Sequence, residues 1–291
     1  MENINQHSLY KKYDSDTVIS ETFRFYKKHF KILFLVSFIV SFLIQIPFYQ
    51  LGIYNQNYLI NETFQMPDKE IIMTLMLMSL FMLIIYTIAY LFICIYVYKQ
   101  EQENSSFISL LGSTIKDYYL KFIGAGIIVM FILMIGGLAG VVVFVVGILV
   151  TFFYFMTVLS PVAPILIIEN KDVFQTIGRS FKLTHKDFWG ALGAILLLIL
   201  LYIVISIVIS IFTVIPFAFD VIKEIMNGTN FIEILKNGSF INSKMTVIGL
   251  IFNIVFSALT FPIFPVFSVI LYFKLKYAED NKEPDFEKYP S

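Results

Sequence analysis

The chain has 291 residues, of which 58% are hydrophobic, 17% aromatic and only 14% charged. This composition excludes an ordinary soluble fold, because a soluble protein must cover its surface with polar groups. The 21 Lys and Arg residues balance the 21 Asp and Glu residues, so the formal net charge of zero gives no reason to expect nucleic-acid binding. We therefore predict a polytopic membrane protein with no nucleic-acid partner.

Long apolar runs follow one another along the chain, and each exceeds the roughly 20 residues that a helix needs to cross a bilayer. The run from Phe122 to Ile168 is about twice that length, so it must fold into two spans with a hairpin near Gly137. The sequence predicts one all-α integral membrane domain over residues 1–273, with six transmembrane helices near 32–50, 71–98, 121–138, 141–168, 189–216 and 246–273. Residues 274–291 are predicted to be a disordered cytoplasmic tail.

The distribution of basic residues sets the orientation. With six spans, nearly all Lys and Arg residues fall on one side, and the exceptions are Lys69, Lys223, Lys236 and Lys244. Since basic residues concentrate in cytoplasmic loops, we predict a multi-pass protein of the cell membrane with both termini in the cytoplasm. The first apolar run follows about 30 residues of mixed charge and is expected to remain as a span, not to be cleaved as a signal peptide.

Three short segments share one residue pattern, and each leads into a span. The segments are ISETFR (19–24), LGSTIK (111–116) and IGRSFK (177–182). Each has the order aliphatic, small, variable, Ser or Thr, large apolar and basic, and a phenylalanine follows at Phe30, Phe122 or Phe188. The sequence therefore predicts three parallel repeats, each an interfacial amphipathic helix followed by a helical hairpin. A coincidence of amphipathic helices before spans is the alternative.

Helical periodicity gives the third segment two faces. Its apolar stripe contains Ile177, Phe181 and Thr184, and its basic face contains Arg179, Lys182 and Lys186. We expect this helix to lie at the cytoplasmic interface with its cations among phospholipid headgroups. Trp189, the only tryptophan, is expected to anchor the following span at the same interface.

The first segment has the same two faces, with Arg24 on the basic side opposite a stripe of Ile19, Phe23 and Tyr26. Arg179 of the third segment stands where the first has Glu21, and Glu169 closes the span that precedes it. We predict that Arg179 pairs with Glu169 or Glu21 and so holds the interfacial helices together. Two separately solvated charges are the alternative.

Residues 161–189, PVAPILIIENKDVFQTIGRSFKLTHKDFW, resemble the recurrent core of a bacterial membrane-domain family found alone or fused to glycerophosphodiester phosphodiesterase domains. The matching residues are Glu169, Arg179, Ser180, Leu183, Thr184, Phe188 and Trp189. Residues 19–30 and 271–280 are similar to that family's opening and closing stretches. The resemblance implies a six-span membrane domain of poorly defined role. Only 18 residues follow Phe273, so we expect no hydrolase domain and no hydrolase activity.

The sequence offers little for catalysis. The interior of the predicted spans contains no ionisable residue of the kind that proton relays and ion-coupled transporters use, and the three histidines lie far apart. We therefore predict no catalytic residue, no metal site and no cofactor. An interfacial enzyme using Glu169 with Thr184 or His185 is the least favoured alternative.

Two Pro-x-x-Pro pairs fall in the fourth and sixth predicted spans, and broken helices of this kind can line a ligand site, although a simple kink is the favoured interpretation. Gln45 and Asn253 are costly to expose to lipid and are expected to face other helices. Together with Pro164 and Pro265 they are our candidates for a polar cavity.

The sequence favours a lipid- or envelope-related membrane domain that binds phospholipid headgroups or serves as a scaffold. Membrane phospholipids are its predicted partners, and protein partners are left open. The alternative is a transporter that moves a small solute or a lipid near the kinked fourth and sixth spans.

Overall fold

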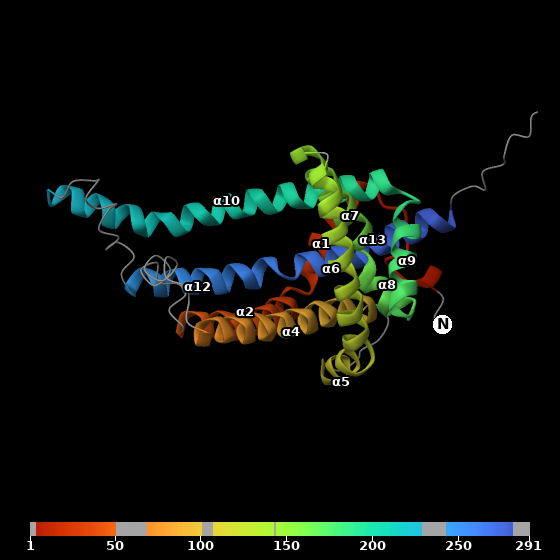
Figure 1. The fold of residues 1–291 in the computed structure, drawn as a ribbon, viewed down its shortest axis with the longest axis horizontal. Helices are drawn as coiled ribbons and strands as arrows, with labels where there is room; N and C mark the ends of the chain where they lie inside the picture. The colour runs from red at the N-terminus through yellow and green to blue at the C-terminus, as the bar shows by residue number, and fades with distance from the viewer. Residues whose placement is uncertain (1–3, 51–68, 101–106, 143, 229–242, 282–291) are drawn as a thin grey trace, which may run out of the picture. The chain divides into compact units, whose positions relative to one another are not determined.

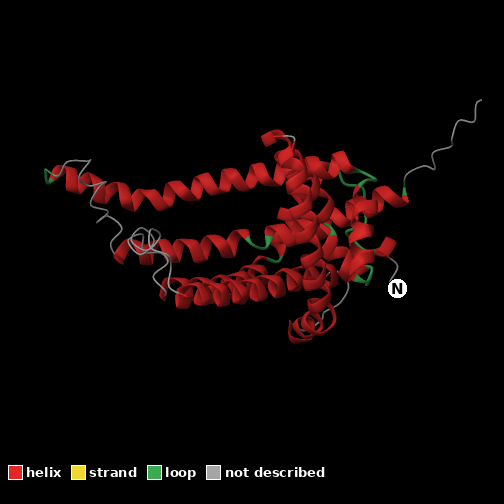
Figure 2. Ribbon diagram, in the orientation of Figure 1, coloured by secondary structure: helices red, strands yellow, loops and turns green. Residues whose placement is uncertain are grey.

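The computed structural model describes residues 4–50, 69–100, 107–142, 144–228 and 243–281. These residues are helical apart from short turns, and Figure 2 shows no strand among them. Six stretches of helix within them are long and apolar enough to cross a membrane. The predicted class, an all-α multi-pass membrane protein, is therefore confirmed.

The helices follow the predicted spans closely, and Figure 1 labels them. In chain order they are η1 (Ile4–Gln6), α1 (Ser15–Lys28), α2 (Phe30–Gln50), α4 (Lys69–Gln100), α5 (Phe107–Ser113), the π-helical turn η2 (Thr114–Tyr118), α6 (Tyr119–Val142), α7 (Phe144–Leu159), α8 (Val162–Ile168), α9 (Val173–Thr184), α10 (Phe188–Met226), α12 (Ser243–Thr260) and α13 (Ile263–Asp280). Each of the three repeated segments is helical. The first and third form separate helices, α1 and α9, whereas the second runs through η2 directly into α6.

Contacts divide the chain, which we expected to be one domain, into two compact units. Unit 1 consists of residues 1–28, 90–198 and 263–291, and unit 2 of residues 29–89 and 199–262. In unit 2, α2 and α12 pack side by side, and a buried cluster forms around Val40, Ile44 and Ala89. The boundary between the units falls within α4 and α10, so long helices contribute to both.

The core of unit 1 lies along α13. All but one of its residues from Ile263 to Leu275 are buried, as expected for a helix that is apolar on every side. Helix α1 packs along α13, and both α8 and α9 also contact it. Helices α6 and α7 pack against each other, and in Figure 1 this pair runs across the direction of α13.

The structure differs from the sequence prediction at the C-terminal tail. We expected disorder from residue 274, but α13 continues to Asp280 and Lys274 is only 4% exposed. Lys276 stabilises this last part of the helix through ion pairs with Glu279 and Asp280, three and four residues further on. Residues 282–291 lie outside the described part of the chain.

The fourth and sixth predicted spans are each broken into two helices. The fourth consists of α7 and α8, which are separated at Ser160 and Pro161, and the sixth of α12 and α13, which are separated at Phe261 and Pro262. Proline has no backbone N–H and cannot continue the helical hydrogen-bond pattern, which explains both positions.

Candidate functional site

A clamp of three charged side chains joins α8, α9 and α13 within unit 1. The Arg179 Nε atom on α9 donates to both carboxylate oxygens of Glu169, at 3.0 Å each. Its Nη1 and Nη2 atoms donate to the two oxygens of Glu279 on α13, at 2.6 and 2.5 Å. The three side chains are only 10 to 21% exposed. The guanidinium group therefore makes paired contacts with two carboxylates.

Neighbouring groups complete this clamp. Lys171 lies 2.7 Å from Glu169, the Tyr272 hydroxyl donates to the same carboxylate at 3.2 Å, and Lys276 lies 3.1 Å from Glu279. The hydrogen bonds to Glu279 raise the pKa of Arg179 above its ordinary value. Burial lowers this pKa, and the nearby charge of Glu169 raises it further. Arg179 thus stays charged, and its contacts are occupied by protein.

The other predicted site residues lie apart from this clamp. Glu21 does not pair with Arg179 but with Lys11 at 3.0 Å and Arg24 at 2.6 Å. Lys182 and Lys186 are exposed, and within the described residues neither forms an ion pair. Trp189 is 79% exposed. Of the predicted residues, the structure therefore brings together Glu169 and Arg179, and leaves Lys182, Lys186 and Trp189 on the surface.

The Ser or Thr residue of each repeated segment is fully buried. Thr22, Thr114 and Ser180 are all 0% exposed. The Thr22 and Thr114 hydroxyls each donate to the carbonyl four residues earlier, at 2.8 Å. Ser180 instead donates to the Val158 carbonyl near the end of α7, at 2.5 Å. The shared position therefore faces the protein interior in all three segments.

Helix α1 buries the face next to its predicted apolar stripe, and the stripe residues Ile19, Phe23 and Tyr26 are partly buried. Its buried residues are Val18, Thr22 and Phe25, whereas Phe23 is only partly buried. On α9 the predicted stripe residues Ile177 and Thr184 are buried together with Thr176, Ser180 and Leu183, while Phe174 is 78% exposed. Small hydroxyl side chains permit close helix packing, which explains why Thr22 and Ser180 lie on the buried faces of the two helices.

The carbonyl groups freed by the broken fourth span find donors on other helices. Pro164 has no N–H, so the Ser160 carbonyl four residues earlier has no helical donor. The Ser268 hydroxyl of α13 donates to that carbonyl at 2.6 Å. Our sequence reasoning missed the role of Ser268, although a serine just after the second proline pair was the available signal.

The candidate polar cavity was not found in the described residues. Gln45 is buried, and its Nε2 atom donates to the Ser257 hydroxyl at 3.1 Å within unit 2. Asn253 is exposed on α12 and does not face another helix of its unit. Pro164 and Pro265 are buried at the helix breaks. None of these residues lines either of the two pockets described below.

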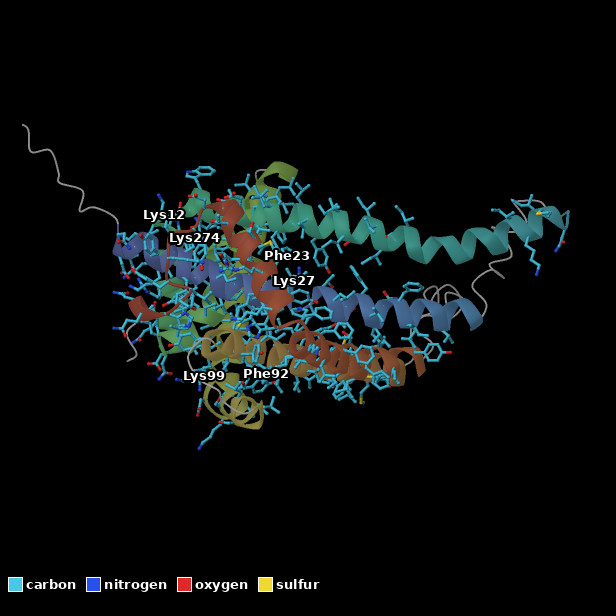
Figure 3. The ribbon with its side chains drawn as sticks, turned by 180° about the vertical axis from the view of Figure 1, so that it is seen from behind. Lys12, Phe23, Lys27, Phe92, Lys99 and Lys274 are labelled. Carbon is cyan, nitrogen blue, oxygen red and sulfur yellow. The ribbon has the colours of Figure 1, made fainter. Side chains whose placement is uncertain are left out.

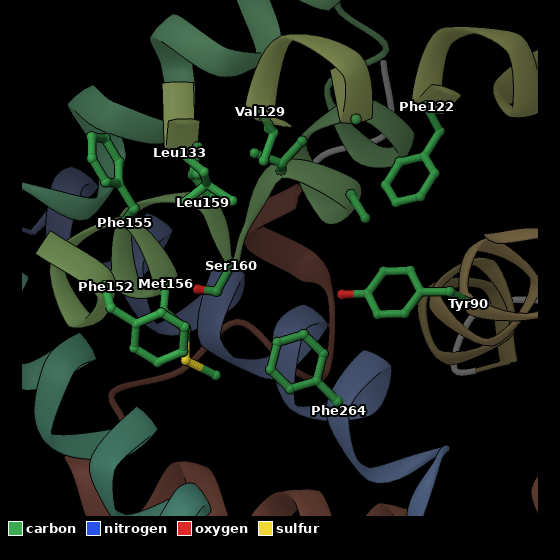
Figure 4. A pocket seen from close by; sticks show the side chains of 13 residues that line it. Tyr90, Phe122, Val129, Leu133, Phe152, Phe155, Met156, Leu159, Ser160 and Phe264 are labelled. Atoms are coloured by element: carbon green, nitrogen blue, oxygen red, sulfur yellow. The ribbon is translucent and has the colours of Figure 1, made fainter. Parts of the chain in front are cut away.

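One pocket in unit 1 is apolar and lies beside the break between α7 and α8. It has a volume of about 390 Å³ and is lined by side chains of α4, α6, α7, α8 and α13, together with Ser160 (Figure 4). The Tyr90 hydroxyl points into it in that view. The other lining residues are Phe122, Gly126, Val129, Leu133, Phe152, Phe155, Met156, Leu159, Val162, Ala163 and Phe264.

A second, polar pocket of about 270 Å³ lies beside the C-terminal end of α13. Lys12, Asp14, Asp187 and Lys274 line it, and Figure 3 shows Lys12 and Lys274 near one another. Lys274 forms an ion pair with Asp187, which also accepts a hydrogen bond from the Gly190 N–H at 3.2 Å. A Cβ atom at Gly190 would overlap both charged groups, so a larger residue here would require Asp187 and Lys274 to shift. The pairing leaves this pocket electrically balanced.

Among the described residues no group of three or more His, Cys, Asp or Glu side chains could hold a metal ion. Comparisons with protein-family models, with curated proteins and with solved structures give no match.

Proposed function

We propose that this protein is a phospholipid-binding domain of the cell membrane, whose helix α9 and the start of α10 lie among the headgroups of the cytoplasmic leaflet. The observation that carries the proposal is that residues 174–189 expose two lysines, Lys182 and Lys186, together with the rings of Phe174 and Trp189. Exposed aromatic rings next to lysines are typical of the membrane interface, where one end of a side chain is apolar and the other wet.

The buried face of α9 supports this assignment because it fixes which side of the helix is free. Thr176, Ser180 and Leu183 face the interior of unit 1, and the clamp at Arg179 holds the helix at its middle. Arg179 itself is not available for a phosphate group, since its donors already bind two carboxylates. The proposed headgroup contacts therefore come from Lys182 and Lys186.

The test is a lipid-selectivity measurement. Each lysine near an anionic surface contributes about 1 kcal/mol, so Lys182→Gln with Lys186→Gln is expected to weaken the preference for anionic over zwitterionic lipid by roughly 30-fold. Native mass spectrometry of the protein in mixed nanodiscs measures that preference. Lys182→Arg with Lys186→Arg keeps the charge and should keep the preference. Unchanged selectivity in the Gln variant would show that the proposal is wrong.

We also propose that both termini are cytoplasmic, and the chain offers a clean test because Cys94, its one cysteine, is buried. Lys182→Cys should be protected from a membrane-impermeant thiol reagent in intact cells. Met226→Cys, at the exposed end of α10, should react. Labelling of Lys182→Cys with protection of Met226→Cys would show that the orientation is the opposite of the one proposed.

We also propose that the chain is related to the membrane-domain family that it resembles, the one found alone or fused to glycerophosphodiester phosphodiesterase domains. What supports it is that the matching residues Glu169, Arg179 and Ser180 all make contacts between helices of unit 1. No enzymatic activity is included in it. Conduction of a polar solute finds no support in the pocket beside the broken fourth span, because apart from the Tyr90 and Ser160 hydroxyls its lining is apolar.

A further inference from the structure

The apolar pocket of unit 1 has the size and the lining of a ligand site. Its volume of about 390 Å³ lies within the range of roughly 300 to 1,000 Å³ that is usual for small-molecule pockets. The rings of Phe122, Phe155 and Phe264 form much of its wall. A space of this size departs from the close packing that is the rule in protein interiors.

The chemistry of the lining excludes a charged or strongly polar occupant. No ionisable group other than the phenol of Tyr90 lines the pocket. The Ser160 hydroxyl already donates to the Thr157 carbonyl, at 3.0 Å. Water is a poor filling as well, because a buried water needs two to four polar partners and apolar cavities stay dry. Apart from the Tyr90 hydroxyl, the lining therefore offers only apolar contacts, and it fits an occupant that is itself apolar.

The position of the pocket indicates that its occupant comes from the membrane. Every lining residue belongs to one of the candidate membrane spans, so the medium around unit 1 at this level is hydrocarbon. Leu133 and Phe152 at the rim are 42% and 54% exposed, which opens the pocket toward the lipid.

We propose that the apolar pocket between α4, α6, α7, α8 and α13 binds a single long acyl chain. The inference deepens the proposed lipid-binding function and rests on it for the class of ligand, but it does not require the lysines of α9. A chain of a bilayer phospholipid and a free fatty acid present the same chemistry to this lining. The experiment distinguishes these two sources.

Gly126 allows the pocket to be closed without disturbing its walls. It lines the pocket, and a Cβ atom added to it meets no heavy atom within 4 Å. The side chain of Gly126→Phe would therefore occupy the pocket itself. Gly137 is the matched control, because it lies on the same helix, has the same open surroundings and does not line the pocket.

The test uses two photoreactive probes, a phosphatidylcholine and a free fatty acid, each with a diazirine on its acyl chain, on the full-length protein in nanodiscs. In the wild type we expect saturable cross-links to residues 122–133 and 152–163, reduced by excess unlabelled lipid of the same kind. Gly126→Phe should lower them at least tenfold, and Gly137→Phe should leave them unchanged. Labelling by one probe alone identifies the source of the chain.

Two results would overturn the proposal. One is labelling that does not saturate in the wild type and is spread evenly over exposed residues such as Met130 and Ile135. The other is equal pocket labelling in wild type and Gly126→Phe. If Gly126→Phe does not fold, the saturation measurement on the wild type still decides. Lys182→Gln with Lys186→Gln should keep the pocket labelling by zwitterionic lipid, so failure of the headgroup proposal and failure of this one are separable.

Discussion

Helices α6 and α13 belong to the same unit and to candidate spans of similar hydropathy, yet their surroundings are opposite. Most residues of α13 are buried, whereas nearly all described residues of α6 are exposed or only partly buried. On α13, Ser268, Tyr272 and Lys274 each contact a partner on another element, whereas the exposed side of α6 is aliphatic and aromatic. Lipid is as apolar as leucine, so in a membrane helix polar residues mark the buried face better than apolar ones do.

The largest expected effect comes from removing the charge at the centre of the clamp on α13. Arg179→Gln should lower the free energy of unfolding by about 3 kcal/mol, because Glu169 and Glu279 would then remain close together without their common cation. Arg24→Gln is the control, since the Arg24 side chain is 69% exposed, and should change it by less than about 0.5 kcal/mol. Unfolding in detergent micelles, followed by circular dichroism, measures both.

The same clamp predicts the outcome of a charge exchange between Glu169 and Arg179. Exchanging Glu169 and Arg179 would place a glutamate beside Glu279 and an arginine beside Lys171, so the exchange should not restore stability. Glu169→Gln with Glu279→Gln in the Arg179→Gln background should restore part of it. Equal stability in the presence and absence of these neutral partners would contradict the clamp.

A pair of matched truncations compares the two helices directly. Ile270→Ala on α13 should lower the free energy of unfolding by about 2 kcal/mol, toward the low end for a buried isoleucine. In a membrane the unfolded side chain is surrounded by lipid instead of water, so the loss comes mainly from the cavity left in the folded state. Ile135→Ala on α6, where the side chain is 64% exposed, should cost less than about 0.5 kcal/mol. Similar losses at the two positions would mean that α6 is covered as well as α13.

Two glycine substitutions compare a position packed closely against α13 with an open position on α9. Gly190→Ala should cost about 1 to 2 kcal/mol, because its Cβ would separate Lys274 from Asp187. Gly178→Ala on the open side of α9 should be neutral or stabilising by up to about 1 kcal/mol, since alanine favours a helix and meets nothing within 4 Å. The difference in melting temperature between the two variants gives the answer.

The smallest effect isolates one hydrogen bond of α13. Ser268→Ala should cost about 0.6 kcal/mol, the usual value for a polar contact between membrane helices. In a Pro164→Ala background the restored N–H can supply the Ser160 carbonyl, and the same serine substitution should then cost less. A double-mutant cycle measures this, and identical losses in both backgrounds would argue against the assigned role of Ser268.

The sequence was sufficient for the class of fold and for the spans, since length and hydropathy alone decide whether a helix can cross a membrane. It also singled out Glu169, which closes an apolar run, and Arg179, which stands where the first repeated segment has Glu21. It could not supply Glu279, which lies 100 residues from Arg179 in a segment that read as a solvated tail. Nor could it select the covered face of α1, because two stripes of similar apolar content lie side by side there and only the packed partner distinguishes them.

The clamp also has a consequence for biogenesis. Glu169 and Arg179 are close in the chain and can pair as soon as α8 and α9 have been made, while Glu279 is synthesised much later. Until α13 is inserted, the two terminal nitrogens of Arg179 have no carboxylate partner, and α1, α8 and α9 lack the helix against which they pack. Chains fold progressively from the N-terminus during synthesis, and α13 is the last helix of unit 1 to be made. Unit 1 can therefore reach its final packing only after α13 has been inserted into the membrane.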